Sequence, residues 1–410
     1  MMGLGAETGR PATLSEALGF SETVVEVGPA HPALRQVMAG VGGTTSFLVS
    51  LDDERIRDLE VEIGLGHRGF ERRVECGVWE DALPYVSRLG HAGGVVAEVA
   101  YCLAVEQLAG IDLPDRAIWL RMLVCELARA TEHFGRLAAL ATAIGLTAAE
   151  AAAREGELAA ARLLAFATGG GPLEGWSRLG GVARALPPAF DSGWPGEWRV
   201  LLDGLARYER LSVRNPTCVE RLRDVAPLSP ETCFAWSVTG PSLRAAGVER
   251  DLRRDDPYLR YASLDFEIPI GSTGDDLDRL LVVIEEIRQS LRIVDQCRSL
   301  LASLGPGVLE AGAPGARAAV DGARGADPGE PGVPKIEVPA GEAWVAVEAP
   351  TGELGFHVVS DGEGLPRRIR CRAPSFFHAQ ALPVLLRGAA LDDLLPTVAL
   401  LHLVAAECDR

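Results

Sequence analysis

The chain has 410 residues, of which 48 % are hydrophobic and 24 % charged, a balance typical of a folded globular protein with more than one structural region. Its 57 Asp and Glu residues outnumber its 40 Lys and Arg residues, and the net charge of −17 argues against nucleic acid or an anionic lipid surface as a partner. The apolar runs fall short of the roughly 18 residues of a membrane-spanning helix, and the N-terminus lacks a secretory-signal pattern, so we expect a cytoplasmic protein.

The first part of the chain is expected to form an N-terminal tail, residues 1–26, and then a small antiparallel β region, residues 27–77. Within the β region, apolar and polar residues alternate on both sides of an acidic turn between residues 45 and 63. This alternation predicts a β-hairpin.

From residue 78 to residue 303, apolar residues recur with helical spacing, which predicts a helical bundle with inserted loops. The clearest helix begins with Pro114 in its first turn and ends at Gly145. Four of its polar residues share one face: Glu126, Arg129, His133 and Arg136. Intrahelical ion pairs on a solvated face are common, so we expect this stripe to lie in solvent, although it also suits a functional role.

Two further helices are expected in the bundle, an alanine-rich one over residues 147–168 and a long one that follows "GSTGDD". At the start of the latter, Ser272 or Thr273 with Asp275 or Asp276 resembles a capping box. Residues 304–341 are rich in Gly, Pro and Ala and predict a linker.

The last part of the chain, residues 342–410, is expected to form a β/α extension, with short strands in "AWVAVEAP" and "GFHVVS" before C-terminal helices. Together these regions predict an α+β protein with a small N-terminal antiparallel β region, a central helical bundle and a C-terminal β/α extension. The eight cysteines include no C-x-x-C pair, and no histidine cluster completes a ligand set, so we expect reduced thiols and no bound metal or iron–sulfur cluster.

Seven blocks of sequence resemble, in the same order, the D subunit of NADH-quinone oxidoreductase (respiratory complex I), a family related to the large subunit of nickel–iron hydrogenases. The blocks are "GPAHP", "LGHRGFE", "AYCLAVEQLAGIDLPDRA", "VTGPSLRAAGVERDLRRDDPY", "VEAPTGELGFHVVSDG", "RAPSFFHAQALPVLLRG" and "ECDR". The resemblance runs from Val27 to Arg410, and it implies a hydrogenase-large-subunit-like fold.

The resemblance also implies partners and a place in the cell. In the family this subunit is peripheral, on the cytoplasmic side of the membrane, and binds no metal of its own. It packs against the peripheral-arm subunit that carries the terminal iron–sulfur cluster, among the other complex I subunits, including one of the membrane arm. Quinone reaches the cleft between the two peripheral subunits, whereas NADH is oxidised on a distant subunit.

A hydrogenase reaction is excluded by ligand chemistry. The first thiolate pair of hydrogenases corresponds to Gly90 and Gly93 in "SRLGHAG", and the second falls near "VAAE", at Val404 and Glu407. None of these side chains is a soft thiolate ligand for nickel and iron.

The resemblance identifies the quinone-site residues and shows that several have changed. The family's usual proton donors, a His and a Tyr, correspond to Arg35 and His91. Arg35 cannot give up a proton, so it is expected to hold a quinone oxygen, whereas His91 titrates near neutrality and is our candidate catalytic proton donor. The alternative for His91 is an exposed loop residue without a ligand. An Asp of the family corresponds to Ala143, and a His near the cluster corresponds to Leu173 or Glu174.

Two more residues are candidates for the quinone cleft. His31 matches the family's "GPxHP", and the resemblance gives it a place at the quinone site, with a structural role at the bend between two prolines as the alternative. Arg88 matches an Arg that the family places beside the cluster, where its charge favours the reduced state, and a surface salt bridge is its alternative. The sequence therefore indicates a complex I-like quinone-site subunit, and a scaffold that keeps the subunit interfaces but has lost the reaction is the alternative.

Overall fold

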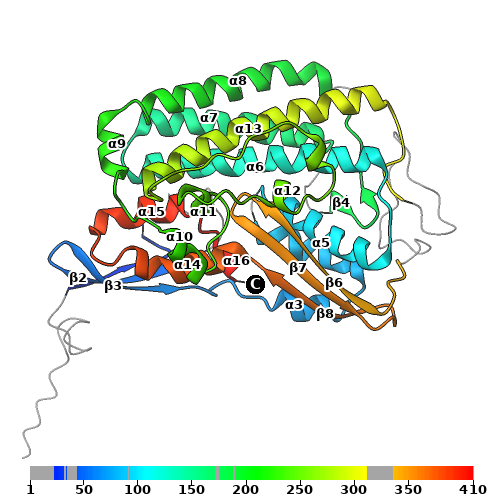
Figure 1. Cartoon of the computed structure of the whole chain (residues 1–410), viewed down its shortest axis with the longest axis horizontal. Coiled ribbons are helices and arrows are strands. Elements are labelled where there is room, and N and C mark those ends of the chain that lie inside the picture. Colours follow the sequence, from blue (N-terminus) through cyan, green and yellow to red (C-terminus); the bar gives the residue numbers. More distant parts are fainter. Residues whose placement is uncertain are drawn as a thin grey trace, which may run out of the picture.

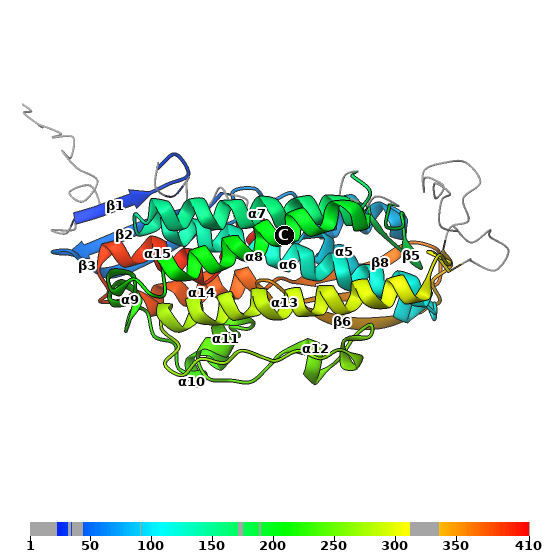
Figure 2. The same ribbon diagram turned by 90° about the horizontal axis from the view of Figure 1, so that it is seen from above.

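One long helix, α6 (Asp115–Ala143), runs through the middle of the molecule. The computed structural model describes residues 23–31, 34, 44–90, 92–170, 175–187, 190–311 and 336–409. Three further long helices lie alongside α6: α7 (Thr147–Ala167), α8 (Phe190–Leu211) and α13 (Asp276–Leu304) (Figures 1 and 2). They form the bundle that the apolar spacing predicts.

Small residues allow these helices to pack closely. A Cβ atom on Gly156 of α7 would lie 2.3 Å from the ring of Phe134 on α6. A Cβ atom on Gly204 of α8 would lie 3.1 Å from the backbone of α7. The alanine-rich sequence of α7 is thus explained by its position between two helices that approach it closely.

Two antiparallel sheets flank the lower side of the bundle (Figure 1). The N-terminal sheet contains β1 (Thr23–Val27), β2 (Ser46–Asp52) and β3 (Arg55–Glu62) in the order β1-β2-β3. The C-terminal sheet contains β6 (Gly341–Ala349), β7 (Gly352–Ser360) and β8 (Pro366–Arg372) in the order β6-β7-β8. Helix α5 (Gly94–Ala109) packs between α6 and the C-terminal sheet.

Short elements connect these layers. They are β4 (Ser177–Arg178), β5 (Gly181–Val182), α3 (Phe70–Val74), α4 (Leu83–Val86), α9 (Pro216–Leu222), α10 (Pro230–Ala235), α11 (Pro241–Ala245), α12 (Leu252–Asp255), α14 (Pro374–Leu385), α15 (Leu394–Leu400), α16 (Ala405–Cys408) and the 3₁₀ turns η1 (Trp79–Ala82), η2 (Ser87–Leu89), η3 (Tyr261–Ser263) and η4 (Leu391–Asp393). Proline starts α9, α10, α11 and α14, because its fixed φ suits a first helical turn and its missing N–H costs nothing there.

The C-terminal segment returns to the N-terminal sheet. The amide of Ile56 donates to the carbonyl of Ala389 at 2.8 Å, and the amide of Gly388 donates back to the carbonyl of Ile56 at 2.7 Å. Beneath these bonds, apolar side chains of the N-terminal sheet share a second core with those of α14, α15 and α16. The two ends of the described chain are therefore held together.

The α+β fold with its three predicted regions is confirmed. The hairpin of β2 and β3 and the helices α6, α7 and α13 occur where the sequence predicts them. Residues 23–26, which we expected in the tail, belong to strand β1, and the cap of α13 is Asp275, whose side chain accepts from the amide of Asp278 at 2.8 Å. Residues 312–335 of the predicted linker lie outside the described part of the chain.

The expectation of a solvated polar stripe on α6 is wrong. Glu126, Arg129, His133 and Arg136 each have 0 % exposure. Arg129 does donate to Glu126 within the helix at 3.2 Å, but other partners of these side chains come from other elements. The spacing of residues along one helix carries no information about those partners. Within the described residues, no helix is both long and apolar enough to cross a membrane.

Candidate functional site

Three segments that are far apart in the sequence meet at one corner of the molecule: residues 64–70, residues 85–94 and residues 404–409. The Asp409 carboxylate accepts a hydrogen bond from the Gly66 amide at 3.1 Å, and the Asp409 carbonyl lies 3.0 Å from Nδ1 of His67. Between the segments is a pocket of about 110 Å³, which we call the corner pocket (Figure 1 marks the nearby C-terminus). It is lined by Gly66, Arg68, Phe70, Tyr85, Leu89, Ala406 and Asp409.

The turn between η2 and α5 is packed so tightly that it requires glycine. A Cβ atom on Gly94 would lie 1.9 Å from the carbonyl oxygen of Ser87, and one on Gly90 would lie 2.9 Å from the amide nitrogen of Gly94. Real Cβ atoms do not approach backbone so closely, so a side chain at either position displaces the turn. Gly90, which the resemblance aligns with a hydrogenase cysteine, is thus required by the backbone of this turn.

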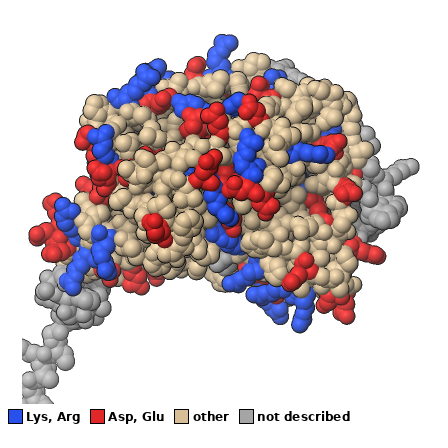
Figure 3. All heavy atoms as spheres, in the orientation of Figure 1, with Lys and Arg blue, Asp and Glu red and all other residues tan. Residues whose placement is uncertain are grey.

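A large groove lies beside the corner pocket, with a volume of about 1190 Å³, and we call it the basic groove. Its lining includes five arginines and two acidic residues: Arg68, Arg72, Arg73, Arg88, Arg178, Glu80 and Asp81. Arg88 is exposed, and the Nε of Arg73 donates to the hydroxyl of Tyr85 at 2.8 Å. Figure 3 shows basic side chains gathered along the lower edge, over α3 and β8. This positive surface is unusual on a chain of net charge −17.

The four predicted quinone-site residues are only partly described. Arg88 lies at the basic groove, as stated above. His31 is exposed in the turn after β1, where its amide donates to the carbonyl of Gly28 at 2.8 Å. Arg35 and His91 lie outside the described residues, so their roles remain predictions. Ala143 is half-buried in the last turn of α6.

Behind the turn at residues 88–93 is a small buried cavity of about 10 Å³, which we call the inner cavity. It is lined by Leu89, Gly90, Gly93, Ala97, Glu132, Ala349, Pro350, Thr351, Leu354, Val404 and Glu407. Gly90, Gly93, Val404 and Glu407, the four positions that the resemblance aligns with hydrogenase cysteines, all line it. Nowhere in the described residues are three or more His, Cys, Asp and Glu side chains arranged to hold a metal ion.

Glu407 is the acid that closes the inner cavity at the C-terminus. Its carboxylate accepts from the hydroxyl of Thr351 at 2.7 Å, from the amide of Ser375 at 3.0 Å and from the Ser375 hydroxyl. Burial raises the pKa of Glu407 to about 7, although these hydrogen bonds favour the ionised form. Glu407 therefore gains and loses a proton near neutral pH.

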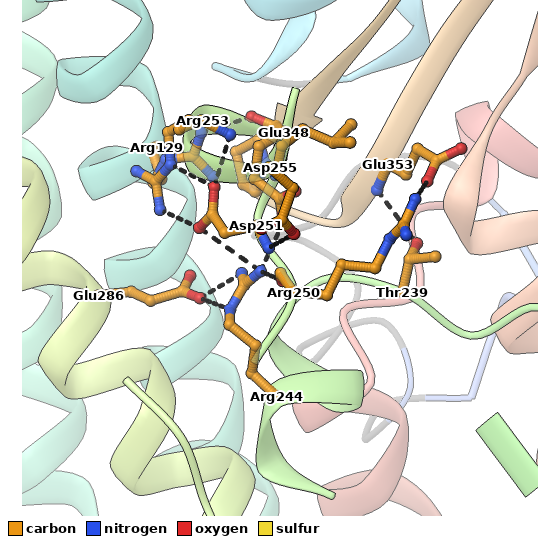
Figure 4. Close-up of polar contacts among 12 residues, drawn as sticks. Arg129, Thr239, Arg244, Arg250, Asp251, Arg253, Asp255, Glu286, Glu348 and Glu353 are labelled. Carbon is orange, nitrogen blue, oxygen red and sulfur yellow. Dashed lines mark hydrogen bonds and ion pairs between the residues drawn. The ribbon is translucent and has the colours of Figure 1, made fainter. Parts of the chain in front are cut away.

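A network of buried charges lies deeper, between α6, α12 and α13 (Figure 4). Glu126 of α6 accepts from Arg253 at 3.1 Å, from the Tyr261 hydroxyl at 2.8 Å and from the Ser290 hydroxyl at 2.7 Å. Burial alone raises the pKa of Glu126, but Arg129 and Arg253 more than offset burial and hold it below its usual value. Glu126 is thus an ionised carboxylate with partners from three other elements.

The second centre of the network is Arg244, on α11. Its Nε donates to Glu286 at 2.8 Å, its Nη1 donates to Glu348 at 2.8 Å, and Asp251 lies 3.5 Å away. Burial lowers the pKa of Arg244, but Glu286 and Glu348 reverse that effect and raise it. The guanidinium therefore stays charged in the interior and joins α11, α13 and β6.

The sequence analysis did not predict most of these buried charged residues. Arg244, Asp251 and Arg253 stand in the block "VTGPSLRAAGVERDLRRDDPY", whose charges carry no helical or strand period. One signal could have revealed it: Glu286 falls on the apolar stripe of α13, four residues after Val282 and one before Ile287. A charged residue on an apolar stripe indicates a buried partner of opposite charge.

Comparisons with known proteins agree with this architecture. Residues 146–410 match the family model described as "Respiratory-chain NADH dehydrogenase, 49 Kd subunit". The chain is 35 % identical to the D 2 subunit of NADH-quinone oxidoreductase from Anaeromyxobacter sp. (strain Fw109-5), over 100 % of this chain and 93 % of that protein. It is 33 % identical to the D subunit of the same enzyme from Pelobacter propionicus, over 97 % of this chain and 98 % of that protein.

A solved structure is similar along nearly the whole chain. It belongs to the membrane-bound sulfane sulfur reductase, described as an archaeal respiratory membrane complex. The TM-score is 0.82 with 30 % sequence identity, and the match covers 95 % of this chain and 98 % of the other.

Proposed function

This chain belongs to the family of the 49 kDa subunit of respiratory-chain NADH dehydrogenase, called the D subunit in bacterial NADH-quinone oxidoreductase, and on that premise we propose that it forms one wall of a quinone-reduction cleft. It acts as a peripheral-arm subunit of a complex I-like enzyme on the cytoplasmic side of the membrane. Its partners are the subunit that carries the terminal iron–sulfur cluster, other complex I subunits and a subunit of the membrane arm.

The observation that carries the proposal is the junction of the corner pocket with the basic groove. Arg68 and Tyr85 line both, and Arg88 lies at the groove. An iron–sulfur cluster with its thiolate ligands is anionic, and a positive groove favours both its docking and its reduced state. The corner pocket, with Phe70 and Leu89 in its lining, suits an apolar quinone headgroup.

The predicted residues then have distinct roles. A quinone that accepts two electrons from the partner's cluster takes up two protons, and negative charge builds up on its oxygens. Arg35 holds that charge by hydrogen bonds without giving up a proton, and His91 donates a proton. His31 orients the bend that carries Arg35, and Arg88 stabilises the reduced cluster electrostatically.

The alternative is a scaffold that keeps the interfaces without the reaction. The test is NADH-driven reduction of a short-chain quinone by the purified complex, compared with complex assembled from a strain that lacks this chain. Activity that depends on the chain and falls in His91→Phe supports the quinone-cleft function. Equal rates with and without the chain exclude it. A parallel assay with a sulfane sulfur compound as acceptor tests the activity for which the structurally similar complex is named.

A further inference from the structure

Glu132 of α6 and His402 form a buried pair beside the inner cavity. The two residues are 4 % and 1 % exposed. Oε1 of Glu132 accepts from the Gly93 amide at 2.8 Å, and its Oε2 lies 3.4 Å from Nε2 of His402. His402 has a φ of 55°, a left-handed conformation uncommon for a residue other than glycine, so its position is imposed by the surrounding fold.

The hydrogen bonds of this pair determine where protons are held. Nδ1 of His402 lies 3.3 Å from the Pro350 carbonyl, and a carbonyl oxygen only accepts, so Nδ1 carries a proton. In a neutral imidazole, Nε2 then bears a lone pair directed at Glu132. An ionised carboxylate facing that lone pair at 3.4 Å is unfavourable in a buried site. One extra proton on either partner turns the contact into an attraction.

The pair is connected to a second acid and to the corner pocket. Glu132 and Glu407 both line the inner cavity, which has room for about one water molecule between them. Leu89 lines both the inner cavity and the corner pocket, so the two spaces are neighbours.

The charged and titratable groups described around the pair come from α6 and from the C-terminal segment. On α6, Arg136 donates to the Pro350 carbonyl at 3.0 Å, and the ring of His133 lies 6.0 Å from that of His402. Burial lowers the pKa of His133 to about 4, so this imidazole is neutral at physiological pH. On the C-terminal side are Glu407 and, on α14, His378, whose pKa burial lowers to about 3. Arg136 is thus a neighbouring positive charge, and Glu407 is a neighbouring acid whose pKa burial raises to about 7.

We propose that Glu132 and His402 share one proton and, together with Glu407, form a buried proton store for quinone reduction in the adjoining cleft. The inference rests on the proposed function. The partner's iron–sulfur centre supplies the two electrons per quinone. The pair releases its shared proton toward the reduced quinone, and Glu407 passes its proton across the inner cavity to refill the pair. Bulk water then reprotonates Glu407.

The test uses the assembled complex with the variant Glu132→Gln. Its amide keeps the bond from Gly93 and offers an N–H to His402, so the packing is retained while the mobile proton is lost. We expect quinone turnover to fall about tenfold at pH 8 and less at pH 6, with an increased solvent deuterium isotope effect. Electron transfer to a hydrophilic acceptor that draws electrons upstream stays at the wild-type rate. A pH profile and isotope effect equal to wild type overturn the proposal.

The matched control is Asp276→Asn. Asp276 is another buried acid. It accepts from the Thr397 hydroxyl at 2.7 Å and pairs with Arg279, and it is not part of the lining of the inner cavity. We expect the pH profile of quinone turnover in Asp276→Asn to match that of wild type. A change in this profile equal to that of Glu132→Gln contradicts a proton store that is specific to the inner cavity.

A second readout does not depend on turnover. Wild-type minus Glu132→Gln infrared difference spectra at pH 7 are expected to contain a protonated carboxyl or an imidazolium band, and bands of only ionised carboxylate and neutral imidazole overturn the inference. A complex that reduces no quinone but shows the protonated band contradicts the proposed function alone.

Discussion

Arg253 and Glu126 are 127 positions apart in the chain, yet Nη1 of Arg253 lies 3.1 Å from Oε2 of Glu126 in the interior of the molecule. The side chain of Arg253 is 1 % exposed and that of Glu126 is 0 % exposed. Because an isolated charge is very costly in such a place, each of these residues stabilises the fold only when it is paired, and Arg253 also pairs with Asp251 at 2.7 Å. The contact fixes α12 against α6, and the amide of Leu252 on α12 donates to Glu348 of β6 at 3.1 Å.

Replacement of Arg253 by Leu is expected to destabilise the chain strongly. It leaves Glu126 and Asp251 buried without their shared partner, and the loss of one member of a buried pair costs about 3–5 kcal/mol. Urea unfolding followed by circular dichroism measures the change. The control is Arg288→Leu, because Arg288 is 40 % exposed in its pairs with Glu209 and Glu285 and such pairs contribute below about 1 kcal/mol. Equal losses in the two variants contradict the buried network.

A side chain at Gly94, the first residue of α5, is expected to displace the turn that precedes it. The Cβ atom of Gly94→Ala would lie 1.9 Å from the Ser87 carbonyl, so the turn must move, at a cost of about 1–3 kcal/mol, and quinone reduction is expected to fall with it. Gly196→Ala in α8 is the control, since nothing lies within 4 Å of its Cβ position and alanine favours a helix. Thermal unfolding and quinone turnover, measured for both variants, test this expectation. A Gly94→Ala protein as stable and active as wild type refutes the tight packing.

Glu407 is expected to make the stability of the chain depend on pH. Burial raises its pKa to about 7 from 4.5, so between these values the folded state binds more protons than the unfolded state, and the free energy of unfolding falls as the pH rises. The variant Glu407→Gln removes this pH-dependent loss of stability, because a glutamine side chain does not titrate. Its stability relative to wild type should increase by about 3 kcal/mol between pH 4.5 and pH values above 7. Urea titrations across this range measure the difference.

The control for that titration is Glu249→Gln, since Glu249 is exposed on the surface. We expect the stability difference between this variant and wild type to stay nearly constant with pH. The proposed titration of Glu407 is wrong if the two variants give parallel curves.

The basic groove is expected to hold the partner subunit through charge. Replacement of Arg68 and Arg72, both exposed, by Glu should lower the yield of assembled complex, and the loss should be largest at low salt, where unlike charges attract most. Native gel electrophoresis of the complex measures the yield. Arg199→Glu, at an exposed position on α8, is the charge-matched control. A yield unaffected by the double variant contradicts a partner at the groove.

Much of the fold could be predicted because its signals are local. The alternation in β2 and β3 and the helical spacing in α6, α7 and α13 are each contained in one stretch of sequence. Strand β1 was missed because its partner β2 lies well beyond it in the sequence. The burial of the α6 stripe was missed for a related reason: Glu126 and His133 are matched by Arg253 and Glu286, which the sequence of α6 does not contain.

The candidate site was predictable to a smaller extent. Family resemblance led to the turn at residues 88–93 and to Arg88, and the structure places a pocket and a groove there. The pairing of Glu132 with His402 could not be foreseen, because it depends on the return of the C-terminal segment to α6. The catalytic and quinone-binding roles of His91 and Arg35 stay predictions.

The most direct test of the account is a high-resolution structure of the purified, assembled complex with a short-chain quinone bound. We predict the headgroup between residues 88–93 of this chain and the partner's cluster-bearing subunit, with a passage to it from the lipid. A cleft filled by side chains, with no such passage, would contradict the central claim that this chain builds a quinone site.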